Sequence, residues 1–331
     1  MRKALVDANW HFHGLRAVIL ENEFLRVVVL PEAGARIVHL IYKPHDVNLL
    51  WNNPRVKPAR LPLGVGYDNA WCGGWDELFP NNIPESIGGE PYPDHGEVWA
   101  AEWDFTCREN DAEAAATFSC RTPISDVVME KSFSLRPGER RLHASYFLRN
   151  SSQEVLPILW NLHIALAISE RHELACPPMK VQLEPSFLGT LEGTPRDLRW
   201  PTVETPQGIV DLRKVPPPSE KKLHFFYGHE LSEGWCGLSN THSGLACGVA
   251  FDRKVFRSCW LFGSFGGWRN LHVAVLEPST GFPYEIARAV RDGTCAQFAP
   301  GEEIRTSVTF SVAENTSRIQ SITAEGEIIG C

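Results

Sequence analysis

Short apolar runs separated by turn residues are the feature of this sequence that most restricts its fold. The runs are rich in Val, Ile, Phe and Trp, and turn phrases such as "RPGE" and "APGEE" bound them. Runs of this length with this punctuation are typical of β-strands, and Pro-Gly pairs suit the tight turns between them. The runs span residues 24–30, 36–42, 98–105, 114–120, 142–148, 155–168, 245–251, 271–277 and 304–312. Because helical periodicity is confined to residues 285–290, we predict an all-β chain that folds as one large antiparallel β-sandwich domain over residues 1–331.

Charge and composition exclude several classes of function. The formal net charge of -8 and the pI near 5.9 argue against the basic footprint of a nucleic-acid-binding protein. No apolar run approaches the ~20 residues needed to span a bilayer, and no apolar segment follows the basic N-terminal residues, as a secretory signal would require. The nine cysteines include no CxxC pair, which is typical of thiols in a reducing compartment. We therefore expect a cytoplasmic protein with neither a nucleic-acid nor a membrane partner.

Two long stretches interrupt the strand pattern. Residues 53–96 are rich in Pro and Gly but also contain Trp71, Trp75 and Tyr92. Loops this long in a compact domain are usually functional or disordered, and the aromatic content favours a packed loop that forms the wall of a site. Residues 169–222 are Pro-rich and more polar, which leaves a lid, an edge excursion or a decorated surface open.

Three residues are candidates for proton transfer. His95 lies between Asp94 and Glu97 in "YPDHGEVW", and it is either a surface turn residue or a group at the rim of a pocket. His163 lies inside the apolar run "LWNLHIAL", where the alternative is a satisfied core histidine. Glu277 ends the apolar run "LHVAVLE". It is either a solvated strand end or a carboxylate whose pKa burial would raise toward the range of a base.

The phrase "GGWDELFPN" offers the residue types that bind sugars. Trp75 can stack on the apolar face of a sugar ring, and Asp76, Glu77 and Asn81 can form hydrogen bonds with its hydroxyls. The alternative for Trp75 is an aromatic residue that pins the loop. A glycosidase-like pair of Asp76 and Glu77 is disfavoured because adjacent strand residues point in opposite directions. His229, in "YGHELSEGW", is a further candidate for hydroxyl binding.

The sequence gives no reason to expect a metal or an organic cofactor. His11 and His13 in "HFH" share one face of a strand, but no third ligand follows nearby, so zinc is disfavoured. The Gly-rich phrase "LFGSFGGW" lacks the strand–GxGxxG–helix context of a dinucleotide site. We therefore expect chemistry by side chains alone.

Several phrases, in this order, resemble the aldose 1-epimerase (galactose mutarotase) superfamily. They are "LENEFLRVVVLPEAGARIVHLIYKPHDVNLLW", "DHGEVW", "LWNLHIAL", "AVLEPSTGFP" and "FAPGEEIRTSVTF". The resemblance covers nearly the whole chain. It rests on the order and spacing of these phrases rather than on any single motif. It implies a β-supersandwich that interconverts the anomers of a free aldose by opening and reclosing the sugar ring, without a metal or an organic cofactor.

The resemblance also implies residue roles. Glu277 would be the general base that takes the proton from the anomeric hydroxyl. His163 would be the general acid at the ring oxygen, and His95 would assist there or hold a hydroxyl. Each positioned proton transfer is worth roughly 10²–10⁴-fold. The family's Asn-Arg-Ile and "GxDH" phrases are absent, and "NNIPE" occupies a comparable region without an arginine, so the identity of the sugar stays open.

Three functions are compatible with a small-molecule sugar as partner. The first is a mutarotase-like isomerase that acts on a free or modified aldose. The second is a catalytically silent sugar-binding protein that kept the sandwich and lost the proton chemistry. The third is another carbohydrate enzyme, such as a lyase or a sugar-phosphate epimerase. A phosphosugar enzyme should cluster Arg and Lys at its pocket, whereas the candidate loops carry mainly acids, amides and aromatics, which favours a neutral sugar.

Overall fold

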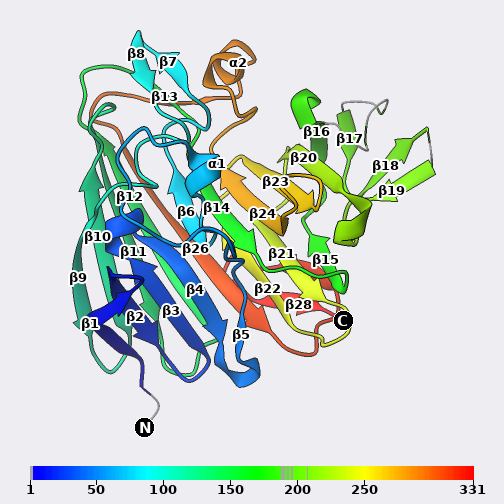
Figure 1. Ribbon diagram of the computed structural model, residues 1–331, viewed down its shortest axis with the longest axis horizontal. Helices are drawn as coiled ribbons and strands as arrows, with labels where there is room; N and C mark the ends of the chain where they lie inside the picture. The colour runs from blue at the N-terminus through cyan, green and yellow to red at the C-terminus, as the bar shows by residue number, and fades with distance from the viewer. Residues whose placement is uncertain (1–2, 188–190, 192–193, 195–196, 207) are drawn as a thin grey trace. The chain divides into compact units, whose positions relative to one another are not determined.

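The computed structural model describes residues 3–187, 191, 194, 197–206 and 208–331 (Figure 1). Strands make up 51% of the structure and helices 7%, which confirms the predicted all-β fold. Neighbouring strands pair antiparallel, as predicted for a β-sandwich. Within the described ranges, no helix combines the length and the hydrophobicity needed to cross a membrane.

The chain forms two compact units. Unit 1 comprises Met1–Ile164 and Thr280–Val308, and unit 2 comprises Ala165–Ser279 and Thr309–Cys331. Each unit therefore combines two separate stretches of sequence, and the chain crosses from one unit to the other at residues 164–165, 279–280 and 308–309. The single domain expected over residues 1–331 stays a prediction.

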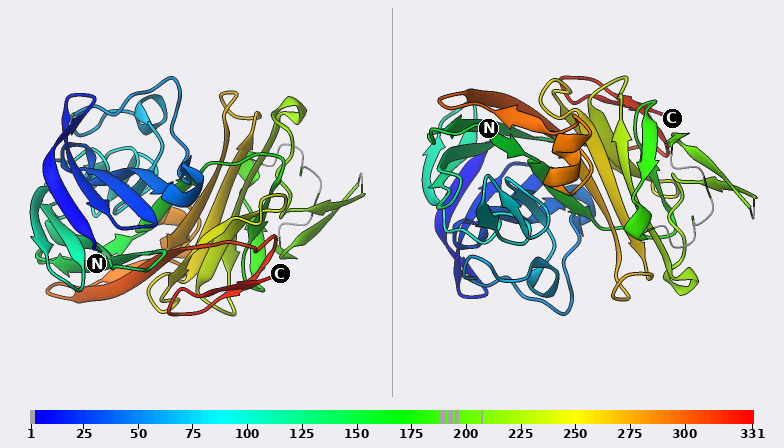
Figure 2. Two further views of the ribbon diagram at one scale, coloured as in Figure 1. Left: turned by 90° about the horizontal axis from the view of Figure 1, so that it is seen from below. Right: turned by 90° about the horizontal axis from the view of Figure 1, so that it is seen from above.

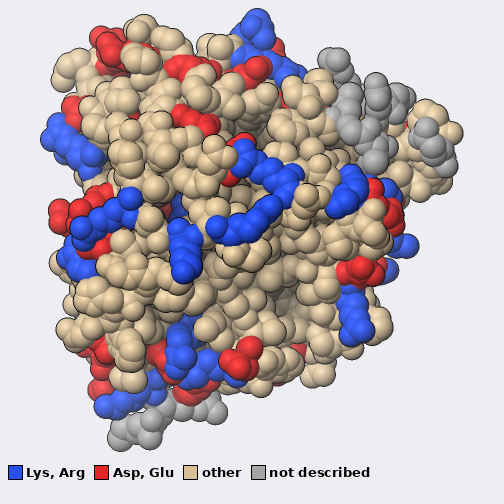
Figure 3. Space-filling model, in the orientation of Figure 1, with Lys and Arg blue, Asp and Glu red and all other residues tan. Residues whose placement is uncertain are grey.

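One sheet of unit 1 has the strand order β1-β2-β3-β4-β6-β14. Its strands are β1 (Leu5–Phe12), β2 (Leu15–Glu21), β3 (Leu25–Leu30), β4 (Arg36–Tyr42), β6 (Trp75–Leu78) and β14 (Asn161–Leu166), with β5 (Val47–Asn48) beside β4. β3 and β4 are buried along almost their whole length, which explains their continuous apolar sequence. Acidic and basic side chains are interspersed over the face that carries β1 to β5 (Figure 3). Glu21 pairs with Arg26 and with Lys43.

The second sheet of unit 1 is a meander that packs on the first. Its strands are β9 (Asp104–Glu109), β10 (Ala114–Arg121), β11 (Val127–Leu135) and β12 (Arg141–Asn150), with β26 (Glu303–Ala313) next to β12. Burial alternates along β11, so every second side chain faces the core. The ring of Phe133 on β11 lies 6.2 Å from that of Trp75 on β6, so the two sheets pack face to face as a sandwich.

The aromatic loop over residues 53–96 is held by short elements of its own. It contains α1 (Tyr67–Ala70), β6 and the hairpin of β7 (Glu85–Ile87) and β8 (Glu90–Tyr92). The helix expected at residues 285–290 is α2 (Ile286–Arg291), and the Glu85 carboxylate accepts the backbone N–H groups of Ile286 and Ala287 at 3.0 and 3.2 Å. β13 (Leu156–Ile158) pairs with β25 (Ala296–Phe298). The loop is therefore a packed part of unit 1.

Unit 2 contains two groups of antiparallel strands (Figure 2). The first has the order β24 (His272–Ser279), β23 (Ser258–Phe265), β20 (Lys222–His229), β16 (Lys180–Leu183), β17 (Asp197–Arg199), β18 (Thr202–Thr205) and β19 (Gly208–Asp211). The second has the order β15 (His172–Ala175), β21 (Trp235–Asn240) and β22 (Ala246–Phe251), with the hairpin of β27 (Ile319–Ile322) and β28 (Ile328–Gly330) as a separate pair. β16 to β19 continue the sheet beyond β20, so residues 169–222 include an edge excursion.

The predicted run at residues 98–105 is the main exception to the strand assignments. β9 begins only at Asp104, and Val98 to Trp103 form no strand. The apolar side chains there are buried for another reason, because this segment packs into the core of unit 1. Trp99 is 2% exposed and Trp103 is fully buried, with its Nε1 donating to the carbonyl of Val98 at 3.3 Å.

Candidate functional site

A buried histidine–carboxylate pair lies at the junction of β6 and β14. In the antiparallel register of these strands His163 is directly opposite Asp76, so both side chains project from the same face of the sheet. Nδ1 of His163 lies 3.1 Å from Oδ1 of Asp76. His163 is 7% exposed and Asp76 is fully buried. Asp76, which the sequence predicts to bind a sugar hydroxyl, therefore orients His163.

Arg36, the first residue of β4, neutralises Asp76. Its Nη2 lies 2.7 Å from Oδ2 of Asp76, and its Nη1 donates to Sγ of Cys72 at 3.2 Å and to the carbonyl of Gly73 at 3.1 Å. Burial by itself would raise the pKa of Asp76, but the Arg36 guanidinium, followed by His163, lowers that pKa below its usual value. Asp76 is therefore a carboxylate, and His163 carries its proton on Nδ1.

Tyr67 on α1 links this pair to the second histidine. Its hydroxyl donates to Oδ2 of Asp76 at 3.0 Å and lies 3.1 Å from Nδ1 of His163. Its ring stacks on the imidazole of His95, with centroids 3.9 Å apart and an interplanar angle of 8°, and it meets the His163 ring edge-on at 5.6 Å. One tyrosine therefore touches both histidines that the sequence marked as candidates for proton transfer.

His95 is held by its neighbour in the sequence. Its Nδ1 lies 2.7 Å from Oδ1 of Asp94, while Oδ2 of Asp94 accepts the backbone N–H of Tyr67 at 2.9 Å. Burial would raise the pKa of Asp94, but hydrogen bonding and attraction to His95 lower it. His95 and Gly96 both have positive φ, and a Cβ on Gly96 would collide with the carbonyl of Phe79. The glycine therefore permits the turn that places His95.

His163 is buried, whereas His95 is partly exposed. The His95 side chain is 21% exposed and the His163 side chain 8%. The Trp71 ring meets the His163 ring at 5.4 Å in an edge-on arrangement. The cluster of Tyr67, Asp76, Asp94, His95 and His163, which we call the two-histidine cluster, combines aromatic surfaces with two imidazoles whose Nδ1 atoms are each fixed by a carboxylate. Such a cluster can hold a polar ring and exchange protons with it.

Glu77, predicted to bind a sugar hydroxyl, points away from Asp76, as expected for adjacent strand residues. Its carboxylate accepts hydrogen bonds from Nζ of Lys131 and, at 3.1 Å, from the hydroxyl of Tyr146. The Lys131 and Glu77 side chains are each 1% exposed. The ion pair is therefore part of the sandwich core. The role of Glu77 in binding a sugar stays a prediction, and this burial disfavours it.

Trp75 and Asn81, the other candidates of this phrase, are also buried. Trp75 is 1% exposed and packs toward Phe133, the arrangement expected of an aromatic that pins the loop. The Asn81 amide donates to the carbonyls of Ile83 and Pro93 at 2.6 and 2.8 Å, which closes the loop that leads to His95. Their contact with a sugar stays a prediction.

The remaining candidates belong to unit 2. Glu277 is on β24, opposite Trp260 in the register, and is 4% exposed. His229 ends β20 with a side chain 17% exposed, and its Nδ1 lies 3.9 Å from Oε1 of Glu230. Because these residues lie outside unit 1, the role of Glu277 as a base and that of His229 in hydroxyl binding stay predictions.

Arg36 and Tyr67 are the members of the site that the sequence analysis did not single out. An arginine at the start of a strand as apolar as "RIVHLIY" must be paired when the strand is buried, and this is the signal that could have found Arg36. Among the described residues, no group of three or more His, Cys, Asp and Glu side chains is arranged to hold a metal ion. His11 is on β1 and His13 follows the strand, and neither has a metal partner in those residues.

The fold is that of the galactose mutarotase-like β-sandwiches. A solved structure described as a "putative aldose 1-epimerase" from Klebsiella pneumoniae subsp. pneumoniae has a TM-score of 0.75 and 12% identity, covering 94% of this chain and 84% of that one. A galactose mutarotase-like protein from Clostridium acetobutylicum has a TM-score of 0.66 and 11% identity, covering 94% and 99%.

A third solved structure, a galactose mutarotase related enzyme from Lactobacillus acidophilus, has a TM-score of 0.62 and 12% identity, covering 92% of this chain and all of that one. No family model matches the sequence. At these identities the likeness shows the fold, and it confirms at that level the resemblance seen in the sequence.

Proposed function

We propose that the protein is an isomerase of the aldose 1-epimerase type, which interconverts the anomers of a free or modified aldose by opening the sugar ring. The observation that carries this proposal is the two-histidine cluster. Each imidazole has its Nδ1 fixed by a carboxylate, and Tyr67 contacts both rings. The likeness of the fold to proteins named for this activity supports it.

The chemistry of ring opening explains why two oriented histidines are useful. The ring oxygen must gain a proton as the anomeric hydroxyl loses one, and the same transfers run in reverse after rotation about the C1–C2 bond. A carboxylate on Nδ1 fixes the tautomer, so that Nε2 is the nitrogen that exchanges a proton with substrate. In this proposal His163 is the acid at the ring oxygen, and His95 assists there or binds a hydroxyl. Glu277 would take the anomeric proton.

Asp76 acts in this proposal as a positioning residue. Its carboxylate holds the His163 ring, and Arg36 keeps that carboxylate ionised. The loss of Asp76 would let the imidazole rotate and change tautomer, which lowers the rate without removing the acid itself. The Arg36–Asp76 ion pair also favours a second candidate, a catalytically silent sugar-binding protein. The buried pair stabilises the fold, so it would be kept even if catalysis were lost.

The test is the rate of anomer exchange, measured by polarimetry or NMR on freshly dissolved α-glucose, α-galactose and their 6-phosphates. We expect His163→Asn and Glu277→Gln to lose at least ~10²-fold in rate and His95→Asn to lose less. His143→Asn is the matched control. His143 is also a carboxylate-paired histidine of unit 1, 2.7 Å from Glu139, but it lies on β12 outside the cluster.

Each outcome discriminates between the hypotheses. Acceleration of a neutral aldose that His163→Asn abolishes and His143→Asn preserves would establish the isomerase. A wild-type rate in Glu277→Gln would remove that residue as the base. Binding of an aldose without acceleration by the wild type would establish the silent binder. Acceleration of the 6-phosphates alone would point to a sugar-phosphate enzyme.

A further inference from the structure

We propose that unit 2 contains a second carbohydrate site, which binds one neutral monosaccharide unit and is built without any residue of the two-histidine cluster. The site is a cavity of about 180 Å³. This is smaller than the roughly 300–1,000 Å³ typical of sites for drug-sized ligands, so its occupant is small. Its lining comes from β15, β21, β27 and the edge excursion within residues 169–222. The sequence alone left the role of that excursion open.

The floor of the cavity follows from the pairing of β15 with β21. Glu173 is directly opposite Ser239 in the register, and these two residues line the cavity together with Ala175. Ile319 of β27 packs with Ala175 and Trp235 in an apolar cluster below.

The roof is the turn between β17 and β18, which carries Trp200 and Pro201. Backbone hydrogen bonds fix it: Trp200 N–H donates to the carbonyl of Met179 at 3.1 Å, and Leu212 N–H donates to that of Pro201 at 2.9 Å. The next residue, Arg213, accepts the backbone N–H of Leu174 on β15 at 2.7 Å. The excursion is therefore tied over the strands of the floor and forms a built enclosure.

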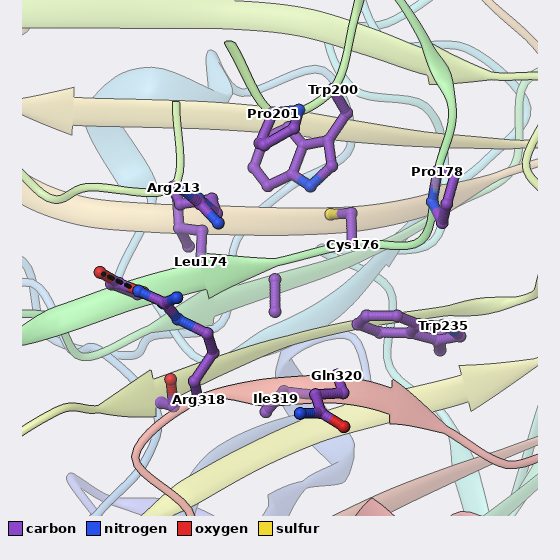
Figure 4. A pocket seen from close by; sticks show the side chains of 13 residues that line it. Leu174, Cys176, Pro178, Trp200, Pro201, Arg213, Trp235, Arg318, Ile319 and Gln320 are labelled. Carbon is purple, nitrogen blue, oxygen red and sulfur yellow. Dashed lines mark hydrogen bonds and ion pairs between the residues drawn. The ribbon is translucent and has the colours of Figure 1, made fainter. Parts of the chain in front are cut away.

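The lining has two chemically different sides. Figure 4 shows the indoles of Trp200 and Trp235 with Pro178 on one side and the guanidinium groups of Arg213 and Arg318 on the other. An indole wall facing a row of hydrogen-bonding groups is the arrangement that a sugar requires, because its C–H face is apolar while its edge carries hydroxyls. A purely apolar ligand would leave the arginine side unmatched.

The charges of this lining are balanced by pairs. Nε and Nη2 of Arg213 donate to the two carboxylate oxygens of Asp211 at 2.9 and 2.7 Å. The same nitrogens of Arg318 contact Glu173 at 3.2 and 3.4 Å. Because each guanidinium is already paired with a carboxylate, the lining offers an anion no uncompensated positive charge and suits neutral hydroxyls better.

Ser239 supplies the observation that most directly points to a ligand. It is 1% exposed, it lines the cavity, and its Oγ has no hydrogen-bond partner among the described residues. Leaving a buried hydroxyl unsatisfied costs about 1–3 kcal/mol. A sugar hydroxyl in the cavity would satisfy it.

The test is ligand titration followed by the tryptophan indole N–H signals in ¹⁵N NMR, assigned through Trp→Phe variants. The probes are the methyl glycosides of glucose, galactose, mannose and N-acetylglucosamine, because a methyl glycoside cannot open its ring and therefore reports binding alone. Glucuronate and glucose 6-phosphate form the anionic arm. We expect saturable shifts of the Trp200 and Trp235 signals by at least one neutral glycoside, with a Kd on the order of 1 mM, the usual scale of weak small-ligand binding.

Variants separate this site from the rest of the protein. His163→Asn should leave the binding unchanged, so the result does not depend on the proposed isomerase function. Trp200→Ala should abolish it, and Ser239→Ala should weaken it about two- to tenfold. Ser311→Ala is the matched control. Ser311 is 3% exposed and its Oγ also lacks a partner among the described residues, but it does not line the cavity.

Three results would overturn the proposal. The first is the absence of a saturable shift at Trp200 and Trp235 with every glycoside. The second is binding by the anionic arm alone, which would contradict the charge balance of the lining. The third is equal affinity of Ser239→Ala and Ser311→Ala, which would show that the buried hydroxyl has no ligand. Each serine-to-alanine change removes only a hydroxyl without a partner among the described residues, so this third comparison decides the matter even if Trp200→Ala fails to fold.

Discussion

Replacing Asp76 with Asn would remove the charge that balances a buried guanidinium while preserving the shape of the side chain. The side chains of Arg36 and Asp76 are 3% and 0% exposed, and Nη2 lies 2.7 Å from Oδ2. Removing one partner of a buried pair costs about 3–5 kcal/mol, because the other charge stays buried without compensation. Since the volume hardly changes, no cavity adds to this loss. We expect Asp76→Asn to lower the free energy of unfolding by about 3–5 kcal/mol.

The assay is urea unfolding followed by circular dichroism and tryptophan fluorescence, whose transitions must coincide if two-state fitting is to hold. A shift of the midpoint at constant m-value then measures the loss. The double variant Arg36→Met/Asp76→Asn should recover part of the stability because it also removes the uncompensated guanidinium.

His163→Asn is the control for the remaining hydrogen bond. It should cost only about 0.5–1.5 kcal/mol, the usual contribution of one hydrogen bond. The reasoning would be refuted if Asp76→Asn cost less than about 1 kcal/mol, or if the double variant lost as much stability as the two single variants together.

Further predictions concern the core, the loop and acid stability. Lys131→Met should destabilise the protein by about 3–5 kcal/mol. Since burial raises the pKa of Glu77, the loss of stability in urea unfolding should be larger at pH 8 than at pH 5, because a larger fraction of the buried carboxyl is charged at the higher pH. Gly96→Ala should cost about 1–3 kcal/mol through overpacking and slow anomer exchange, whereas Gly14→Ala, also at positive φ but with open space around its Cβ, should leave exchange unchanged. Because the pKa of Asp76 in the folded protein lies below its usual value of 3.8, this carboxylate contributes stability above that pH, and the contribution is lost as the pH falls through the folded-state pKa. Asp76→Asn should therefore show a shallower loss of stability in acid.

The strands were predictable from the sequence because burial and pleating leave a local signature. β11 alternates buried and exposed positions, and β3 is apolar along nearly its whole length. Residues 98–103 were assigned wrongly because apolar residues mark burial of any kind. Trp99 and Trp103 are buried in the core of unit 1 without pairing to a neighbouring strand.

The partners within the site were harder to predict because they depend on register between distant segments. The sequence marked His163 and Asp76 separately, but only the pairing of β6 with β14 brings them opposite each other. Asp76 was therefore interpreted as a sugar ligand rather than as the group that orients the histidine. The Asp94–His95 contact was accessible because the residues are adjacent, whereas the stacking of Tyr67 on His95 joins residues 28 positions apart across a loop.

The division of unit 1 into two stretches of sequence has a consequence for synthesis on the ribosome. The segment after Thr280 closes the unit: the Thr280 hydroxyl accepts the backbone N–H of Trp160 at 2.9 Å, and the Thr280 N–H donates to the carbonyl of Trp160 at 3.1 Å. At about 5–20 residues per second, the residues from Ala165 to Ser279 take roughly 6–23 s to emerge. During that interval the strands of unit 1 already outside the ribosome lack their last partners, and their unpaired edges are open to aggregation. The translation speed of the middle of the message therefore affects how much of the chain reaches the folded state.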